Sequence, residues 1–393
     1  MLTITNAKII MPDHILEPGA VSIADGRIVN ISDRPSMSRV SGEQLDAEGL
    51  YLAPGFIDIH VHGGGGADFM DSTVEAFLRV AETHIQYGTT AMLPTTLTSS
   101  TSDLIALFST YEEAMRINDR GARFLGLHLE GPYFAMNQRG AQDPRYIRAP
   151  DPQEYEPILA QYHQLIARWS AAPELPGALE FGQKVRMYGI LLALAHTDAI
   201  YEEILPAVDS GYRLATHLYS GMSGMTRRNA YRYAGTIESC LLLDAIDVEI
   251  IADGVHLPEP FLKLIHKVKG TSKTILITDA MRAAGMPAGD SILGSLKNGI
   301  EVIVEDGVAK LPDRSSFAGS VATADRLIRT MINQGGASLV EAVQMMTVNP
   351  ARVLGRDHEI GSIAVGKIAD LVLFDENIQI QSAFVSGEIR YQR

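Results

Sequence analysis

Short apolar runs alternate with longer amphipathic segments between about residues 55 and 335. The runs read GFIDIHVHG, TTAMLPTTLT, RFLGLHLEGP, ARWSAAPEL, ILLALAHTDA, RLATHLYSGM, VEIIADGVHLP and TILITDAM. Segments such as 72–87, 152–167, 200–209 and 258–268 carry helical patterns between them. Near-continuous apolar strands that alternate with helices are typical of a parallel sheet covered on both faces. Eight such units in about 280 residues predict an α/β fold of the TIM-like (β/α)8 barrel type.

The two ends of the chain have a different pattern. Residues 1–54 and 356–393 contain short alternating strands such as LTITNAKII and QIQSAFVSGEIRY, separated by turn residues. We therefore expect a small β-sandwich domain built from both termini, beside a barrel domain at 55–355. A further hairpin is predicted at 295–313, after the eighth strand, with Glu305, Asp306 and Gly307 at its turn.

Composition narrows the class of protein. Of 393 residues 46% are hydrophobic and 20% charged, which excludes global disorder. The net charge of −14 argues against a nucleic-acid or anionic-membrane partner. One cysteine, Cys240, excludes an internal disulfide framework, and its apolar surroundings predict a buried thiol. Without a signal peptide or an apolar run of roughly 20 residues, a cytoplasmic protein is expected.

Polar residues recur where the apolar strands end. Barrel enzymes place their chemistry on the face formed by the carboxyl ends of the strands. His60 and His62 are two residues apart, so their imidazoles project from one face of a strand and can bind one divalent ion. Comparable ends of four other strands carry Glu130, His196, His217 and Asp279. This recurrence predicts a metal site at the mouth of the barrel.

The motifs GFIDIHVHG, HLEGPY, LAHTDA, THLYSGM, ADGVH, ITDAMRAAG and FAGS occur in one order along the chain. In that order they resemble the N-acetylglucosamine-6-phosphate deacetylases of the amidohydrolase superfamily, and the tail GSIAVGKIADLVLFD is similar to the closing segment of that superfamily. The resemblance covers essentially the whole chain. It implies a homodimeric hydrolase of amino-sugar catabolism. The expected substrate is a small-molecule sugar phosphate, an N-acetylhexosamine 6-phosphate and first N-acetyl-D-glucosamine 6-phosphate, split into acetate and the amino-sugar phosphate.

The same resemblance implies how the metal is held. Glu130 is the expected central ligand, completed by His196 and His217. Because His60 and His62 are both retained, a second ion that shares Glu130 and lies near Asp279 is also expected. Imidazole and carboxylate ligands suit Zn, Fe, Co, Mn or Ni, with one or two ions per chain. Asp279 is the predicted general base, which would take a proton from water and pass it to the departing amine.

Substrate contacts are implied at positions where the chain departs in part from the family. Ser220 and Gly221 stand where family members commonly have Asn-Ala, and Gln142 replaces a family histidine. The FAGS segment supplies Phe317, Ala318 and Gly319. The remaining expected contacts are His256 and a phosphate-binding arginine, Arg228 with Arg227 as the alternative, which could reach a partner subunit's site. Asp58 and His128 are expected to orient ligands rather than bind metal.

Two other classes of function remain open at this stage. One is an amidohydrolase acting on N-acetylgalactosamine 6-phosphate, an N-acyl amino acid or a cyclic amide. Cyclic-amide members generally bridge their metals with a carboxylated lysine, and Glu130 at strand three counts against them. The other is a non-catalytic homologue that binds a sugar phosphate, against which the intact set of metal ligands counts. Metal analysis combined with an acetate-release assay would separate these readings.

Overall fold

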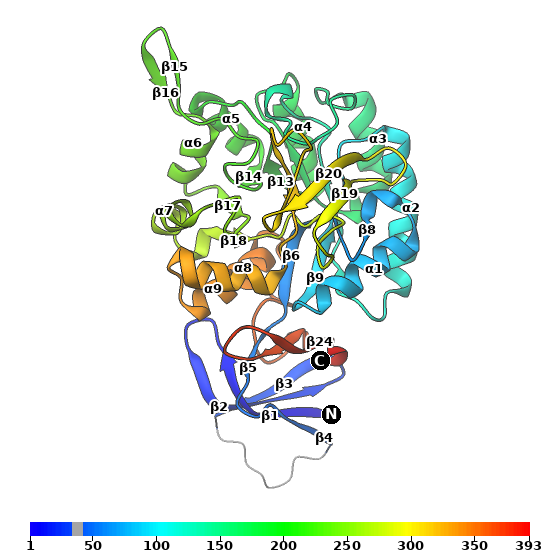
Figure 1. Cartoon of the computed structure of the whole chain (residues 1–393), viewed down its shortest axis with the longest axis vertical. Coiled ribbons are helices and arrows are strands. Elements are labelled where there is room, and N and C mark those ends of the chain that lie inside the picture. The colour runs from blue at the N-terminus through cyan, green and yellow to red at the C-terminus, as the bar shows by residue number, and fades with distance from the viewer. Residues whose placement is uncertain (34–41) are drawn as a thin grey trace.

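The computed structural model describes residues 1–33 and 42–393. It is a mixed α/β fold in two bodies, a large helix-covered body and a smaller strand-rich body that holds both termini (Figure 1). The larger body corresponds to the alternating part of the sequence. Among the described residues, no helix combines the length and the apolar character that crossing a bilayer requires.

Parallel strands form the centre of the larger body, in two hydrogen-bonded sheets. One sheet has the order β10-β9-β6 and the other β11-β12-β13-β14-β17-β18, and all their pairings are parallel. The strands are β6 (Phe56–Val61), β9 (Thr89–Pro94), β10 (Arg123–Phe124), β11 (Leu127–Glu130), β12 (Ile166–Ala171), β13 (Leu191–Leu194), β14 (Tyr212–Ala215), β17 (Asp247–Ile250) and β18 (Thr274–Leu276).

Parallel bridges join the two sheets at two places. Thr95, just after β9, pairs with His128 of β11, and Val61 of β6 pairs with Ala280 beyond β18. The backbone N–H of Asp279 also donates to the carbonyl of His60 at 2.9 Å. The strand ends that carry the predicted ligands are therefore held next to one another, in an arrangement of the TIM-barrel type.

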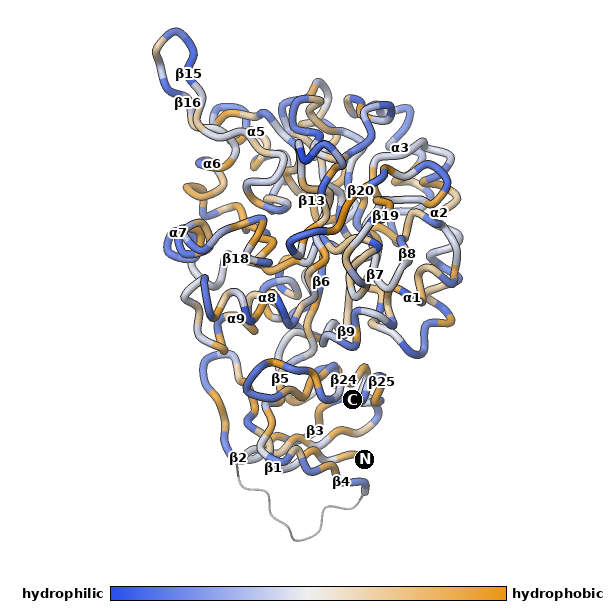
Figure 2. Tube along the Cα trace, in the orientation of Figure 1, coloured by the Kyte–Doolittle hydropathy of each residue, from blue (hydrophilic) through white to orange (hydrophobic). Residues whose placement is uncertain are grey.

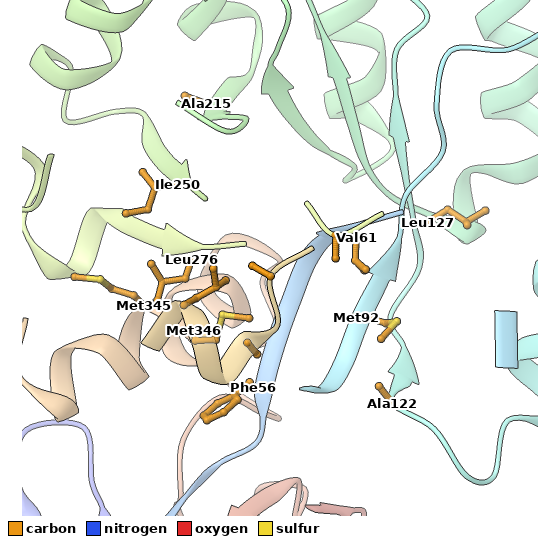
Figure 3. Packing of buried hydrophobic residues seen from close by; sticks show 14 of the residues in the cluster. Phe56, Val61, Met92, Ala122, Leu127, Ala215, Ile250, Leu276, Met345 and Met346 are labelled. Atoms are coloured by element: carbon orange, nitrogen blue, oxygen red, sulfur yellow. The ribbon is translucent and has the colours of Figure 1, made fainter. Parts of the chain in front are cut away.

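Helices cover the outside of these strands because each presents one apolar face to them. They are α1 (Val74–Ile85), α2 (Thr101–Ile117), α3 (Pro152–Tyr162), α4 (Ala178–Met187), α5 (Tyr201–Ser210), α6 (Thr236–Leu242), α7 (Glu259–Lys269), α8 (Ala324–Thr330), α9 (Leu339–Met346) and α10 (Val348–Val353). One continuous apolar cluster fills the space between strands and helices, and Figure 3 shows part of it, including Phe56, Met92, Leu276 and Met346.

The helix predicted at 152–167 ends earlier than expected. Asp151 caps its start by accepting the N–H of Gln153 at 2.9 Å, and α3 then stops at Tyr162. Ile166 already belongs to β12, where its side chain is buried. Pairing of β12 with β11 thus overrides the helical pattern at the end of this segment.

The described strands of the smaller body form one eight-stranded sheet with the order β25-β24-β23-β5-β1-β2-β3, in which β4 also pairs with β1. Its strands are β1 (Leu2–Ile10), β2 (Ile15–Ala24), β3 (Arg27–Ser32), β4 (Glu43–Asp46), β5 (Tyr51–Pro54), β23 (Leu371–Phe374), β24 (Ile380–Val385) and β25 (Glu388–Gln392). An apolar cluster with members from both ends of the chain packs within it. Arg123 of β10 binds Asp370 at 2.5 Å and so ties the two bodies together.

Two smaller antiparallel units leave the larger body. The predicted hairpin is confirmed as β20 (Ile300–Glu305) and β21 (Val308–Lys310), and Asp306 and Gly307 at its turn have φ of 53° and 75°, as a two-residue turn requires. The outer strands β19 (Gly289–Leu293) and β22 (Phe317–Ser320) extend it to four strands. The second unit, β15 (Thr226–Arg228) and β16 (Tyr231–Tyr233), projects from the body, and its tip is hydrophilic (Figures 1 and 2).

Candidate metal centre

Glu130 lies at the centre of four histidines. It ends β11 and is only 2% exposed. Its Oε1 is 3.0 Å from Nε2 of His217 and 3.3 Å from Nε2 of His196. The same oxygen is 3.6 Å from Nε2 of His60, and Oε2 is 3.3 Å from Nε2 of His62. The structure therefore brings together the ligands that the strand ends predicted.

Asp279 faces the two histidines of the first strand. Its Oδ1 is 3.2 Å from Nε2 of His62 and 3.4 Å from Nε2 of His60, and the two ring nitrogens are 3.1 Å apart. Within residues 1–33 and 42–393, two buried groups have the spacing of a metal site, namely His60, Glu130 and His217, and His60, His62 and Asp279. His60 belongs to both groups, so the two candidate positions are adjacent.

The donor atoms fit a divalent cation. Nδ1 of His196 is 2.7 Å from the carbonyl of Gln138, and Nδ1 of His217 is 3.1 Å from the carbonyl of Ser220. A proton on each Nδ1 satisfies these carbonyls and leaves the Nε2 lone pair directed at Glu130, as in metal-binding histidines generally. The set consists of imidazole nitrogens and carboxylate oxygens, which suits a first-row divalent metal.

Three of these side chains depend on an unusual backbone. His196, His217 and Asp279 have φ of 46°, 32° and 47°, in the left-handed region that non-glycine residues seldom occupy. Hydrogen bonds hold the chain there: the carbonyl of His196 accepts the N–H of Ala135 at 2.8 Å, and the carbonyl of Asp279 accepts the N–H of Ser320 at 2.7 Å. Backbone strain of this kind is typical of functional sites.

The electrostatics of the cluster favour bound positive charge. Burial raises the pKa of Glu130, but His60 together with hydrogen bonds from His196 and His217 holds it well below its usual value. The pKa of Asp279 is likewise lowered against its burial by His60 and His62. Burial lowers the pKa of His62, yet the two carboxylates outweigh it and raise that pKa to about 10. Both carboxylates therefore stay ionised at neutral pH.

A buried ion pair below the cluster was missed from the sequence. Arg168 of β12 and Glu249 of β17 are both 0% exposed and form a two-pronged ion pair, with Nη2 to Oε2 at 2.7 Å. Arg168 also donates to the carbonyl of Ile59 at 3.0 Å and to the hydroxyl of Thr216 at 2.8 Å. Glu249 Oε2 is 3.8 Å from Nδ1 of His60. The sequence signal that could have revealed this pair is a charged residue, Arg168 or Glu249, inside each of two mainly apolar runs.

Asp58 and His128 occupy supporting positions in the same layer. Asp58 accepts the hydroxyl of Thr278 at 2.5 Å and the N–H of His60 at 3.2 Å, and burial raises its pKa to about 7. His128 lies between the hydroxyls of Thr95 at 3.2 Å and Ser170 at 2.7 Å. Their contacts hold the strand ends in place beneath the cluster.

A cavity of about 550 Å³ opens above the cluster. Of the predicted substrate contacts, it is lined by Gln142, Ser220, Gly221, His256, Phe317 and Gly319. Gln142 is fixed, because its Nε2 donates to Glu130 at 2.7 Å and its Oε1 accepts the N–H and the hydroxyl of Thr98, each at 2.9 Å. His256 Nδ1 is 2.8 Å from Asp253.

Three of the predicted contacts lie elsewhere. Ala318 is buried in the apolar cluster of the β19–β22 unit. Arg227 and Arg228 are exposed on β15, outside the lining of their own chain's cavity. The cavity lining instead includes Lys310 and Arg314, which the sequence did not single out. Arg227 and Arg228 follow the THLYSGM motif closely in sequence, but this proximity could not show that the chain leaves the body there as a projecting hairpin.

Comparison with known proteins finds relatives over essentially the whole chain. A sequence profile of the amidohydrolase family matches residues 51–390. The chain is 34% identical to an N-acetylglucosamine-6-phosphate deacetylase of Lysinibacillus sphaericus, over 100% of this chain and 98% of that protein. It is 32% identical to an N-acetylgalactosamine-6-phosphate deacetylase of Escherichia coli O157:H7, over 97% of each.

Among solved structures, N-acetylglucosamine-6-phosphate deacetylase from Pasteurella multocida superposes with a TM-score of 0.92 at 29% identity, covering 100% of both chains. A variant of the Mycobacterium smegmatis enzyme in complex with N-acetyl-D-glucosamine-6-phosphate superposes with a TM-score of 0.90 at 30% identity, over 100% of this chain and 99% of that one. The chain therefore belongs to the amidohydrolase family and, within it, to the N-acetylglucosamine-6-phosphate deacetylases.

Proposed function

We propose that this protein is a metal-dependent deacetylase that converts an N-acetylhexosamine 6-phosphate, first of all N-acetyl-D-glucosamine 6-phosphate, into acetate and the amino-sugar phosphate. The observation that carries the proposal is the convergence of four histidines and two carboxylates at the floor of an open cavity. A protein that only bound sugar phosphate would have no need of such a cluster. Full-length relatives with this activity in their names support the substrate class.

Asp279 is suited to move the proton. A divalent ion held by the cluster supplies activation of a water molecule and polarisation of the amide carbonyl. Asp279 lines the cavity beside His62, where its carboxylate can accept a proton from that water. Asp279 then donates the same proton to the amide nitrogen, so that the leaving group departs as a neutral amine. The oxygen of the water stays in the acetate.

We further propose two ions per chain, chosen from Zn, Fe, Co, Mn and Ni. The two buried groups that share His60 support this number. Elemental analysis of purified protein should then give more than one divalent ion per chain, and His60→Ala combined with His62→Ala should reduce it. If the protein carries a single ion and retains it after the double substitution, the two-ion proposal is wrong. The only metal position would then be the one at Glu130, His196 and His217.

The site also implies an architecture and an assembly. We infer that the parallel strands close as a (β/α)8 barrel over residues 55–355, with residues 1–54 and 356–393 forming the sandwich domain. A role for Arg228 in holding phosphate requires a second subunit, since this residue lies outside the cavity of its own chain. We therefore propose a homodimer in which the partner's Arg228 approaches the cavity, and a cytoplasmic location, which suits the free and buried Cys240.

N-Acetylgalactosamine 6-phosphate is the second candidate substrate, because relatives with that specificity match at 32% identity over nearly the whole chain. A screen of N-acetylhexosamines with and without the 6-phosphate, read out as acetate released, tests both. N-Acyl amino acids and cyclic amides belong in the same screen. Metal-loaded protein that binds sugar phosphate and releases no acetate would instead be a non-catalytic binder.

A further inference from the structure

Two permanent cations lie on the rim of the catalytic cavity. Lys310, at the end of β21, and Arg314, in the loop before β22, are the Lys and Arg side chains among the described residues that line it. Two side-chain hydroxyls of the same loop, from Ser315 and Ser316, line it as well. All four belong to the β19–β22 unit, whereas the metal cluster belongs to the ends of the parallel strands.

This separation of floor and rim matches a substrate with two different ends. In the proposed function the cluster at the floor takes the N-acetyl end of the substrate, so the phosphate has to be held elsewhere in the cavity. A net charge of −14 gives no long-range attraction for a dianion, so its affinity has to come from close contacts. An N-acetyl group at the floor leaves the phosphate nearer the rim, where the cations are.

The backbone of Arg314 is in a left-handed conformation, with φ of 58°. Such strain in a non-glycine residue that lines a cavity is a reason to look for function. Its guanidinium already holds a carboxylate: Nε is 3.1 Å from Oε1 of Glu305, and Nη2 is 3.3 Å from Oε2. This fork is the geometry with which arginine holds two oxygens of a phosphate.

Lys310 shares the same anionic neighbour. Its Nζ is 2.8 Å from Asp306 and 3.3 Å from Glu305, and Asp306 raises the pKa of Lys310, which therefore stays charged. The side chain of Lys310 is 19% exposed and that of Arg314 is 54% exposed. With half of the Arg314 side chain in water, its ion pair with Glu305 is weak, so exchanging that carboxylate for another anion costs little.

A third arginine connects the hairpin to the other end of the cavity. Arg326 donates to the carbonyl of Gly307 at 3.0 Å and to the carbonyl of Asp253 at 2.8 Å. Asp253 in turn accepts the backbone N–H of His256 at 2.8 Å and contacts its ring. The cationic rim and His256 are thus parts of one connected unit.

We propose that Lys310 and Arg314 form an anion-binding site for the 6-phosphate of the substrate, and that Glu305 holds the guanidinium fork until phosphate replaces it. The inference rests on the proposed function for the identity of the anion. Both cations belong to the chain that supplies the metal cluster, so this site adds to the contact proposed for the partner's Arg228 and does not replace it.

The test uses a ligand that cannot be deacetylated. Binding of glucose 6-phosphate and of glucose is measured by calorimetry on the metal-loaded protein. Arg314→Ala should weaken the binding of glucose 6-phosphate by about 10- to 150-fold, which is the effect of losing a hydrogen bond to a charged group. Lys310→Ala should act in the same direction. Glu305→Gln should act in the opposite direction and tighten binding, since the fork loses its competitor.

Lys297→Ala is the matched control. This substitution removes the same charge from the same inserted unit, but Lys297 lines a neighbouring cavity and not the catalytic one. Equal losses in Arg314→Ala and Lys297→Ala would indicate general electrostatics and overturn the proposal. So would wild-type protein that binds glucose 6-phosphate no better than glucose, or a preference that Arg228→Ala alone abolishes.

The outcome also separates this inference from the proposed function. Suppose that the wild-type protein releases acetate, but Arg314→Ala and Lys310→Ala bind glucose 6-phosphate as tightly as the wild-type protein. The proposed function then stands and the proposed rim site is wrong. If the variants lose affinity as expected but no acetate is released from any N-acetylhexosamine 6-phosphate, the anion site stands and the deacetylase proposal is wrong.

Discussion

The floor and the rim of the cavity are built in opposite ways. On the floor, His60 is 0% and Glu130 2% exposed, and their positions are fixed by strand ends and by a buried layer of polar side chains. On the rim, Arg314 has half of its side chain in water, and its partner Glu305 lies on the same inserted unit. This contrast is expected where rigid strand ends hold the reacting groups and a more variable connecting segment contacts the rest of the substrate.

The first prediction addresses the floor and has the largest expected effect. Glu130→Gln should abolish both metal content and activity, because an amide oxygen is a weaker ligand than a carboxylate and Glu130 contacts four histidines. Elemental analysis and an acetate-release assay measure the two losses. Glu301→Gln, which removes an exposed carboxylate from β20, is the control and should change neither.

The second prediction separates catalysis from metal binding. Asp279→Asn should lower kcat by roughly 10²–10⁴-fold, the range for loss of an acid or base, because the amide can still accept a hydrogen bond but cannot take the proton. Substrate affinity should change much less. Near-normal kcat in a variant with unchanged metal content would assign the proton transfer to another group.

The third prediction concerns the layer under the floor. Arg168→Met leaves Glu249 buried without its partner and should destabilise the protein by about 3–5 kcal/mol. The paired change Arg168→Met with Glu249→Leu should recover much of that loss, because no unpaired charge remains. Urea denaturation of the single and double variants measures both, and equal destabilisation of the two would contradict an effect due to the unpaired charge.

The fourth prediction concerns Arg228 on the projecting β15–β16 hairpin and is the smallest. Arg228→Ala should lower kcat/KM for the 6-phosphorylated sugar by about 10-fold, the lower end of the range for a hydrogen bond to a charged group, because this arginine is exposed. The unphosphorylated sugar should be unaffected. The partner's Arg228 is the one expected at the cavity. Sedimentation experiments should therefore show a dimer under the conditions in which Arg228→Ala lowers kcat/KM.

Several features of the site were predictable from the sequence because they depend on local periodicity. Alternation in a strand places His60 and His62 on one face, and parallel strands bring their carboxyl ends to one edge. Glu130, His196, His217 and Asp279 follow the same rule, and the structure brings all six together. The turn at Asp306 and Gly307 was also predictable, since it requires only a local backbone preference.

Other features were not predictable, because they depend on contacts between distant segments. Arg168 and Glu249 meet across strands that are 81 residues apart. Gln142 is placed on Glu130 by its hydrogen bonds to Thr98, 44 residues away. No periodicity encodes such pairings.

The sequence by itself therefore determined the alternation of strands and helices, the histidines and carboxylates at the strand ends and the family. Only the tertiary structure decided that Arg227 and Arg228 lie outside their own cavity while Lys310 and Arg314 line it. The physical reason is that side-chain direction within a strand follows from local geometry, whereas the course of a loop depends on what the rest of the chain packs against it.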